Sequence, residues 1–428
     1  MSAPVDADLI PPALRDAELL EQLSAEQGTP LFVYDEDDLR RRCREFASAF
    51  GADGVAYAGK AFLCIAMARL VAEEGLHLDV ATGGELSVAL RAGFPAGRIV
   101  FHGNNKSTDE LAQALDAGVG RIVADSFDEL DRLERLAGDR AAPPSVLVRV
   151  TPGVEAHTHE FIETGTLDSK FGFVVHDGVA LAAARRVVES KVLQFGGLHS
   201  HIGSMIERLD AYTRALAIVV DLCAAIEEST GTRVEELNMG GGLAARYLAT
   251  DPVMSLGEYE ATLRSTLKDR VADAGLEEVP RLMVEPGRSI SASAAVTLYR
   301  VGTVKTIPQG RTYVAVDGGM SDNPRPVLYG AGYEAYLPAR VGEPRALVCS
   351  IAGKHCEQGD VVVADARLPE GVQVGDLLAV PVTGAYGYSM ASNYNKVPRP
   401  AVVFVRDGRA RVVIRRETPD DLVHLDAD

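Results

Sequence analysis

The sequence lacks the features that mark secreted, disulfide-bonded or membrane-spanning proteins. It contains no CxxC pair, and its five cysteines are scattered (Cys43, Cys64, Cys223, Cys349, Cys356), which argues against a zinc site or a disulfide scaffold. No apolar run reaches the length of a membrane span. The first residues, MSAPVDADLIPPALRDAELL, are acidic where a signal peptide needs a basic segment and an apolar core. We therefore expect a reduced, cytoplasmic protein.

Basic charge is also scarce. The chain has 43 Lys+Arg against 61 Asp+Glu residues, a formal net charge of −18, and no basic cluster of the kind that binds nucleic acid or an anionic membrane surface. Any site for an anionic ligand must therefore be built locally. With 428 residues, 47% hydrophobic and 24% charged, the chain has the composition of a soluble globular protein and the length of two domains.

Short apolar runs rich in β-forming residues alternate with segments of helical period over the first two-thirds of the chain. Eight such runs are predicted as strands: 55–59, 76–82, 98–103, 121–126, 145–151, 195–203, 235–242 and 280–288. Most gaps between them have the spacing of amphipathic helices, as at 62–74, 83–93, 107–117, 176–190 and 208–229. This alternation predicts a (β/α)8 TIM-type barrel. An open doubly wound sheet is the competing interpretation.

After residue 288 the pattern changes to apolar–polar alternation broken by Gly and Pro, as in VTLYRVGTVKTI and AVVFVRDGRARVVIRR. This alternation predicts mainly antiparallel β structure. The run LFVYDE at 31–36 can supply one more strand to it. We therefore predict an α/β barrel over 36–288 and a β domain formed from both chain ends, 1–35 and 289–428.

The loops after the seventh and eighth predicted strands occupy the places where (β/α)8 barrels often hold phosphate. Here they read MGGGL and VEPGR. Consecutive glycines let backbone N–H groups approach a phosphate, and Arg288 adds a planar donor fork. These loops predict an anion site at the carboxyl ends of the strands.

Lys60, in YAGKAF, ends the first predicted strand between small and apolar residues. Such a lysine is expected to be partly desolvated, which would lower its pKa and free its amine for imine formation. A surface lysine with a buried aliphatic stem explains the motif equally well. Asp79 ends the second strand and Glu85 follows. Capping of the next turn is the favoured role for Asp79, and orientation of a neighbouring cation is the alternative.

In HSHIGS, His199 and His201 alternate on one predicted strand and should point to the same side. A histidine can stack on an aromatic cofactor, and the Ser204 hydroxyl can bind phosphate. A metal pair is the rival interpretation, disfavoured because no carboxylate stands at useful ligand spacing. His157 and His159 in EAHTHEF are interpreted as loop residues rather than ligands. We therefore expect no metal.

Four further segments carry polar groups that suit a site. Glu285 in VEPGR can pair with a protonated pyridine nitrogen, or it is an ordinary strand-end residue before a turn. The second domain adds GGMSDNPRPVLYG with Arg325 and Tyr329, GKHCEQGD with Cys356 and Glu357, and TGAYGYSMASNYN with Tyr386 and Tyr388. Each alone fits a β-domain surface or core, and a lone free cysteine is usually a small buried hydrophobe. Their joint presence favours the functional interpretation.

The motifs YAGKAF, HSHIGS, MGGGL, VEPGR, DGGMSDN with PRPVLYG, HCEQGD and GAYGYSMASNYN occur in this order along the chain. In order and separation they resemble the bacterial diaminopimelate decarboxylases, a family of fold-type III pyridoxal-phosphate decarboxylases. The FHGNNKS segment looks most like actinobacterial members. The resemblance runs from residue 30 to the end. Two departures, KAFLC without the family's usual asparagine and CEQGD for the usual CESGD, lie beside functional positions.

The resemblance implies a cofactor site for pyridoxal 5′-phosphate. Lys60 would form the Schiff base with the cofactor, His201 would stack on the pyridine ring and Glu285 would contact the ring nitrogen. Ser204, Gly242 and the 285–288 segment (Glu285, Pro286, Gly287, Arg288) would surround the cofactor and its phosphate. Tyr386 would touch both cofactor and substrate.

The same resemblance implies decarboxylation of meso-2,6-diaminopimelate to L-lysine, the last step of lysine biosynthesis. Arg288, Arg325 and Tyr329 would hold the distal carboxylate of the substrate, Glu357 its distal ammonium, and Cys356 would protonate the carbon that loses CO2. The HCE and GAY segments come from the neighbouring subunit in this family, which implies a homodimer with shared active sites.

A physical argument supports that substrate. Diaminopimelate carries an amino acid group at both ends, and Arg325 with Glu357 can meet a carboxylate and an ammonium together. Decarboxylation of ornithine, lysine or arginine is the nearest alternative. An alanine-racemase-like enzyme would use a tyrosine for proton transfer, and the HCE segment argues against it. A non-catalytic homologue would typically have lost the lysine or the acid, and this chain keeps both.

Overall fold

The computed structural model describes residues 4–138, 140–154 and 169–427. The chain folds into two compact units. The barrel unit comprises Cys43–Ala244 and Met254–Gly287, and the β unit comprises Met1–Arg42, Ala245–Val253 and Arg288–Asp428. His157 and His159 lie outside the described residues.

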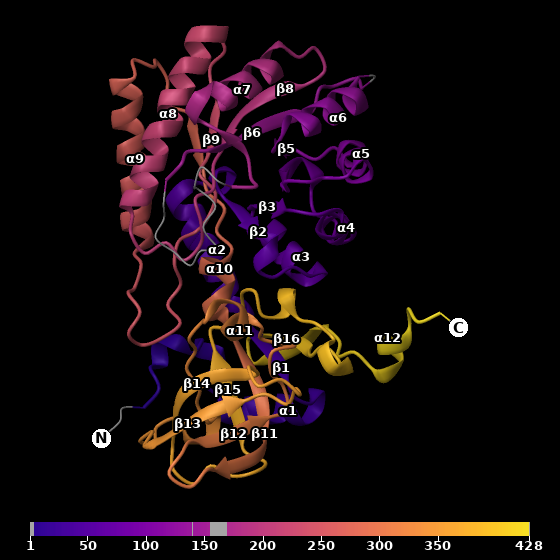
Figure 1. The fold of residues 1–428 in the computed structure, drawn as a ribbon, viewed down its shortest axis with the longest axis vertical. Coiled ribbons are helices and arrows are strands. Elements are labelled where there is room, and N and C mark those ends of the chain that lie inside the picture. Colours follow the sequence, from indigo (N-terminus) through magenta and orange to yellow (C-terminus); the bar gives the residue numbers. More distant parts are fainter. Residues whose placement is uncertain (1–3, 139, 155–168, 428) are drawn as a thin grey trace. The chain divides into compact units, whose positions relative to one another are not determined.

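Parallel strands in chain order form the wall of the barrel unit (Figure 1). They are β2 (Ala56–Ala58), β3 (His77–Val80), β4 (Ile99–Phe101), β5 (Arg121–Ala124), β6 (Ser145–Thr151), β8 (Gln194–His199), β9 (Glu236–Asn238) and β10 (Arg281–Met283). Backbone hydrogen bonds of 2.9 Å from Ala56 N to Val284 O and from Val284 N to Gly54 O join the first strand to the last. The predicted (β/α)8 barrel is confirmed. The open-sheet alternative is wrong, because its first and last strands would not pair.

Helices follow most of the strands, and in Figure 1 they flank the strands on both sides. They are α3 (Ile65–Glu73), α4 (Gly83–Arg91), α5 (Thr108–Ala117), α6 (Phe127–Ala137), α7 (Val179–Glu189), α8 (Asp210–Thr230) and α9 (Leu256–Asp273), and α2 (Glu36–Phe50) precedes β2. Thr82, Ser107, Ser126 and Ser255 cap α4, α5, α6 and α9 by accepting a backbone N–H in the first turn. Such caps satisfy backbone N–H donors that the start of a helix leaves unpaired, so each of these four helices begins at a defined residue. Among the described residues, no helix combines the length and apolarity of a bilayer span.

A small apolar cluster fills part of the barrel unit's interior. Ala56, Val100, Val123, Leu147 and Met283, contributed by five different strands, are buried together. Full burial of an aliphatic side chain the size of valine or leucine stabilises a fold by roughly 1.5–3 kcal/mol. Packing at these positions therefore keeps the strand ends, and the loops that follow them, at fixed positions.

The β unit contains a mainly antiparallel sheet. Its strands are β1 (Leu31–Asp35), β11 (Ala295–Thr306), β12 (Thr312–Val316), β13 (Leu347–Ala352), β14 (Val361–Leu368), β15 (Leu377–Pro381), β16 (Ala401–Arg406) and β17 (Arg409–Ile414). The predicted N-terminal strand is confirmed, because β1 pairs antiparallel with β11 and parallel with β16. Short helices α10 (Arg288–Ser291) and α11 (Arg325–Tyr329) belong to this unit.

Several barrel strands end earlier than their apolar runs, among them β10, which ends at Met283 within the run 280–288. The run 195–203 is a strand only to His199, and the run 235–242 only to Asn238. The residues beyond these ends form loops. The expectation that His199 and His201 alternate on one strand therefore fails, since His201 follows the last strand residue.

Candidate active site

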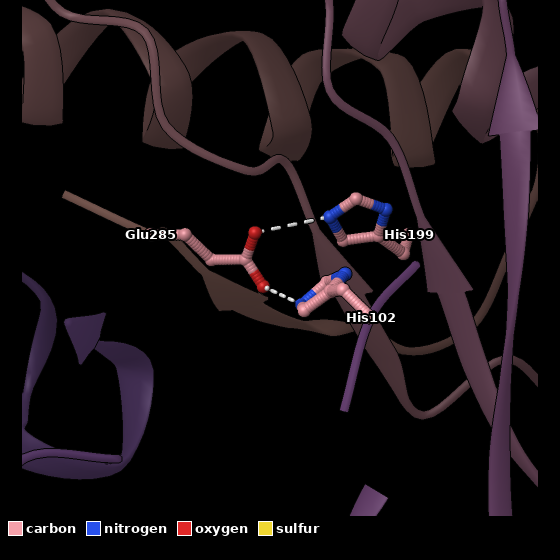
Figure 2. A group of neighbouring side chains, drawn as sticks. All are labelled: His102, His199 and Glu285. Carbon is pink, nitrogen blue, oxygen red and sulfur yellow. Dashed lines mark hydrogen bonds and ion pairs between the residues drawn. The ribbon is translucent and has the colours of Figure 1, made fainter. Parts of the chain in front are cut away.

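Four chain segments bring polar side chains together in the barrel unit, each at or just after the end of a strand. Glu285 follows β10, and its carboxylate accepts three hydrogen bonds. His102 Nε2 lies 2.8 Å from Oε1, and His199 Nε2 lies 3.1 Å from Oε2 (Figure 2). Asn238 Nδ2 donates to Oε1 over 2.7 Å. All four side chains are buried, so the group has the properties of an internal ionic site.

The protonation of this group follows from its burial and its partners. Burial lowers the pKa of His199 to about 4, so this imidazole is neutral at pH 7 and donates its Nε2 proton. Burial alone would raise the pKa of Glu285, but the electrostatic influence of His102 and the hydrogen bonds from His102 and His199 outweigh it, and the pKa lies well below its usual value. A carboxylate can accept about four hydrogen bonds. Glu285 is therefore an ionised acceptor with room for one more donor.

The same three side chains include the atoms that ligate metals. The nitrogens of His102 and His199 and a Glu285 oxygen lie within 4.8 Å of one another. The sequence argument against a metal, that no carboxylate stands at useful spacing, is wrong, because Glu285 reaches the histidines from another strand. The separations are nevertheless those of direct N–H···O hydrogen bonds, and the third neighbour of the carboxylate is an amide N–H of Asn238. This geometry favours an organic N–H donor over a metal ion as the further partner of the Glu285 carboxylate.

Asp79 does not cap a helix as expected. It is buried within β3, and its Oδ1 lies 3.8 Å from His102 Nε2. Burial raises the pKa of Asp79. The cap of α4 is Thr82, whose hydroxyl accepts from Glu85 N, while Glu85 Oε2 accepts from Ala81 N over 2.6 Å. Asp79 therefore belongs to the polar group around Glu285.

Lys60 lies in the 3-10 turn Gly59–Ala61 that ends β2. The expected partial desolvation of this lysine is wrong in this structure, where its side chain is exposed. The strand ends at Ala58, and the turn places the next side chain in solvent. Its charge nevertheless acts on the site. Burial raises the pKa of Asp79, and the Lys60 ammonium partly offsets that rise. Burial and the Lys60 ammonium both lower the pKa of His201.

The loop after β9 has no room for side chains. A Cβ on Gly240, which has a φ of +65°, would lie 2.8 Å from His201 Nδ1, and one on Gly241 would collide with the carbonyl oxygen of Glu285. Gly242 O accepts from Ile206 N over 2.8 Å, which joins this loop to the one after β8. Ser204 lies half-buried in that second loop. Neighbouring loops therefore pack closely around the carboxyl ends of β8 and β9, where only glycine fits.

Gly287 lies where the loop after β10 approaches the loop after β2. A Cβ on Gly287 would lie 2.9 Å from the Cβ of Ala58 and 3.0 Å from that of Ala61. Ala58 N donates to Pro286 O over 3.1 Å. The 285–287 segment is thereby held against the turn that contains Lys60, within the barrel unit.

The β unit holds a separate cluster of arginine and tyrosine. Arg288 and Arg325 are both buried. Arg288 Nη1 donates to the Tyr247 hydroxyl over 2.7 Å, and its Cζ lies 4.6 Å from the ring centroid of Tyr386. Arg325 lies 4.5 Å from the Tyr247 ring centroid and donates to the Tyr333 hydroxyl. Phenol groups therefore surround both guanidinium groups. Tyr329, expected beside Arg325, lies half-buried at the end of α11.

Tyr386 has a left-handed backbone, with a φ of +59°, and so does Val382 four residues earlier, with a φ of +61°. This conformation is unfavourable for any residue with a Cβ and most of all for a β-branched one. Gly384 lies between them, where a Cβ would collide with the carbonyl oxygen of Ser291. Strained backbone of this kind persists where the surroundings over-determine it and often marks functional segments. It fixes the Tyr386 ring beside Arg288.

The HCEQGD segment is anchored through its histidine and presents the next two side chains outward. His355 is buried, and its Nε2 lies 2.9 Å from the Ser321 hydroxyl. Its backbone N–H donates to Asp360 over 2.8 Å. Cys356 and Glu357 are exposed, and Tyr394 Oη lies 3.4 Å from Glu357 Oε2. In the described part of this chain the thiol and the carboxylate thus face solvent.

The sequence did not single out several residues of these clusters. His102 lies within FHGNNKS, a segment used only for the resemblance, and its position after β4 was the available signal. Asn238, Tyr247 and Tyr333 carry no local motif. Their roles arise from contacts across strands and between distant segments, which no spacing along the chain reveals.

Known proteins resemble this chain along almost its whole length. The profile of the family described as "Pyridoxal-dependent decarboxylase, pyridoxal binding domain" matches residues 36–292. A diaminopimelate decarboxylase of Mycobacterium tuberculosis is 50% identical over 416 residues, 95% of this chain and 93% of the relative. The chain belongs to the diaminopimelate decarboxylase family. The Bacillus subtilis member is 48% identical over 408 residues, covering 94% of this chain and 92% of its own. A crystal structure of the M. jannaschii member with L-lysine has a TM-score of 0.88 at 33% identity, covering 95% of this chain and 94% of that one.

The residues present fit the cofactor that this family name implies. Pyridoxal 5′-phosphate presents a pyridinium N–H, a phosphate and an aldehyde. Glu285 is a buried ionised acceptor with capacity for one more donor, which suits the pyridinium N–H. The glycines at 240–242 leave backbone without side chains beside Glu285, which suits the phosphate. Lys60 supplies an amine from the turn Gly59–Ala61, which follows Ala58, whose N–H donates to Pro286 O. The diaminopimelate decarboxylase family therefore accounts for the barrel-unit cluster.

Proposed function

We propose that this chain is a carboxy-lyase that converts meso-2,6-diaminopimelate to L-lysine and CO2 with pyridoxal 5′-phosphate, as the last step of lysine biosynthesis in the cytoplasm. Membership of the diaminopimelate decarboxylase family supports the reaction. The observation that carries the cofactor chemistry is the buried Glu285 carboxylate with its three hydrogen-bond donors.

The barrel unit is proposed to hold the cofactor. Lys60 would bind it covalently through its amine and His201 would stack on its ring, and the remaining contacts would come from Ser204, Gly242, Glu285, Pro286 and Gly287. When bound, pyridoxal 5′-phosphate supplies an electron sink for the electron pair that CO2 leaves behind. The role of Glu285 is to keep a proton on the ring nitrogen, which it can do because its own pKa is low. His102, His199 and Asn238 orient the carboxylate for that contact.

The β unit is proposed to bind the substrate. Arg288, Arg325 and Tyr329 would hold the carboxylate distal to the reacting carbon, and Glu357 would hold the distal ammonium. Arg288 would also approach the cofactor phosphate. Tyr386, which stacks on Arg288 in this structure, would contact both ligands. Planar guanidinium groups suit a carboxylate because they can donate two parallel hydrogen bonds.

Cys356 is proposed as the acid that delivers a proton to the carbon that has lost CO2. Its exposure and that of Glu357 in this chain are consistent with a homodimer in which each subunit contributes these residues to its partner's active site. Thiols with exposed sulfur can exchange protons, whereas buried ones are usually inert.

The substrate test compares CO2 release from meso-diaminopimelate, ornithine, lysine and arginine, with Lys60→Ala as the inactive control. We expect release from diaminopimelate alone, and none from the control. Preferential release from ornithine, lysine or arginine would replace the substrate assignment with that alternative. Full turnover by Lys60→Ala would overturn the cofactor chemistry. Sedimentation or light scattering of the purified protein tests the dimer.

A further inference from the structure

Tyr247 lies at the centre of the arginine–tyrosine cluster of the β unit. Its hydroxyl accepts from Arg288 Nη1 over 2.7 Å, and its ring centroid lies 4.5 Å from Arg325 Cζ. The Tyr247 and Tyr333 rings meet edge to face, with centroids 5.3 Å apart. One phenol side chain therefore contacts both guanidinium groups, through two chemically different interactions.

The Arg325 guanidinium is a buried positive charge among phenol groups. Arg325 is 5% exposed, and in the described part of the chain its guanidinium contacts the phenol side chains of Tyr247 and Tyr333. A buried cation without a counter-ion is costly, as the strong destabilisation shows when one partner of a buried ion pair is removed. Phenol faces and hydroxyl lone pairs stabilise a guanidinium only in part. The cluster is therefore built to be completed by an anion.

Tyr247 reaches this cluster from an unusual part of the chain. It belongs to the segment Ala245–Val253, which leaves the barrel unit between β9 and α9 to join the β unit. Arg246 Nη2 binds Asp6 over 2.6 Å, and the Tyr247 backbone N–H donates to Asp251 over 2.9 Å. These contacts on either side fix the backbone of Tyr247, so the ring is held independently of any ligand.

We propose that Tyr247 is a positioning residue that holds Arg288 and Arg325 ready for one carboxylate, and that it thereby makes the site selective for amino acids with a carboxylate at the distal end. This proposal rests on the proposed function, because it takes the two arginines as the distal-carboxylate subsite. Tyr247 acts through the arginines and does not itself react.

The test uses two ligands that differ by one carboxylate. L-lysine, the proposed product, retains the distal carboxylate, and cadaverine lacks it. In Tyr247→Phe the ring remains beside Arg325 but the acceptor for Arg288 is lost. Because hydrogen bonds to charged groups contribute about 1.5–3 kcal/mol, we expect L-lysine to bind the holoenzyme about 10–100-fold more weakly. Cadaverine should bind with unchanged affinity, and KM for diaminopimelate should rise more than kcat falls.

Matched variants separate positioning from stability. Tyr313→Phe removes a half-buried phenol hydroxyl from β12 of the same unit and should leave both affinities unchanged. Tyr247→Leu, which also removes the ring, should weaken L-lysine binding further than Tyr247→Phe. Calorimetric titration of each holoenzyme with both ligands gives these values, and the visible absorption of bound cofactor reports an intact barrel unit.

The outcomes are distinct. Unchanged L-lysine affinity in Tyr247→Phe would overturn the proposal, and so would an equal loss of L-lysine and cadaverine affinity. Failure of the wild-type protein to release CO2 from diaminopimelate would overturn the proposed function. In that case a carboxylate-dependent difference that requires the Tyr247 hydroxyl would still support the positioning role.

Discussion

His102 Nε2 lies 2.8 Å from Glu285 Oε1, although the two residues are 183 positions apart in the sequence. His102 follows β4 and Glu285 follows β10, so the contact joins the ends of two strands that are not neighbours in the barrel. Together with His199 and Asn238, His102 holds Glu285 as an ionised acceptor. The cofactor chemistry of this family depends on such an acceptor.

Replacing the carboxylate with its neutral isostere tests that dependence. Glu285→Gln places an amide beside three donors, and its NH2 group cannot accept from any of them. Loss of the charge and its hydrogen bonds should lower CO2 release by about 100-fold and cofactor affinity by about 10-fold. Activity assays and spectroscopic titration of the apoprotein measure both. The exposed Glu277→Gln is the matched control, and an equally active Glu285→Gln would contradict this role.

The buried histidine makes stability depend on pH. An unfolded histidine binds a proton near pH 6.5, whereas burial lowers the pKa of His199 to about 4. The unfolded chain therefore binds more protons between these values, and the contribution of His199 is fully present above pH 6.5 and is lost as the pH falls toward 4. Between pH 7 and pH 5 the free energy of unfolding should fall by about 2 kcal/mol on this account.

Urea unfolding at the two pH values measures this loss. His199→Gln keeps an N–H donor for Glu285 but does not titrate, so its free energy of unfolding should fall by about 2 kcal/mol less than that of the wild type. His176 is exposed, and His176→Gln should retain the wild-type dependence. A His199→Gln variant as pH-sensitive as the wild type would show that other groups dominate.

Two glycine-to-alanine changes should have different effects, one on cofactor binding and the other on stability. At Gly241 a Cβ would collide with the carbonyl oxygen of Glu285, so Gly241→Ala must displace one of the two loops and weaken cofactor binding by about 10-fold or more. At Gly257, near the start of α9, the nearest neighbour of a Cβ would be Ser255 Oγ at 3.8 Å. Gly257→Ala should stabilise the protein by about 0.5–1 kcal/mol through helix propensity. Cofactor titration and thermal unfolding distinguish the two.

Removing the exposed thiol should separate catalysis from cofactor binding. Cys356→Ala removes the proposed proton donor, and loss of a general acid typically lowers a rate by about 100–10,000-fold. Its side chain is exposed, so cofactor affinity and unfolding should change little. Gln358→Ala, in the same exposed loop, is the control and should retain the wild-type rate. Equal loss of rate and cofactor affinity in Cys356→Ala would indicate a structural role instead.

The barrel could be predicted from sequence because its signals are local. Each strand, such as β6 at Ser145–Thr151, is a short apolar run bounded by turn residues, and each following helix has its own period. Closure of the ring through Val284 and Ala56 depends on strands at opposite ends of the pattern, so it could only be inferred from their number. The early end of β8 at His199 was missed, because the apolar run continues past the last paired residue.

The sequence allowed site residues to be proposed only where residue type carries the chemistry. Lys60 and Glu285 stand out in motifs, but the partners that set their properties do not. The low pKa of Glu285 arises in part from His102, which lies far away in sequence. The exposure of Lys60 depends on the turn after Ala58, which no composition rule fixes. Tyr247 is an ordinary tyrosine until the fold places it between two arginines.

The segment Ala245–Val253 limits how this protein can be divided into fragments. The chain crosses between the two units at 42–43, 244–245, 253–254 and 287–288, so neither unit is encoded by one continuous stretch. A fragment cut at residue 288 would carry Tyr247 and Leu248 but lack Arg325 and Gly332, which they contact in the β unit. Recombination that exchanged whole β units between relatives would have to carry this nine-residue insert with it. The half of the protein that is proposed to bind the substrate is therefore encoded in three separate stretches of the chain and cannot be exchanged as one continuous segment.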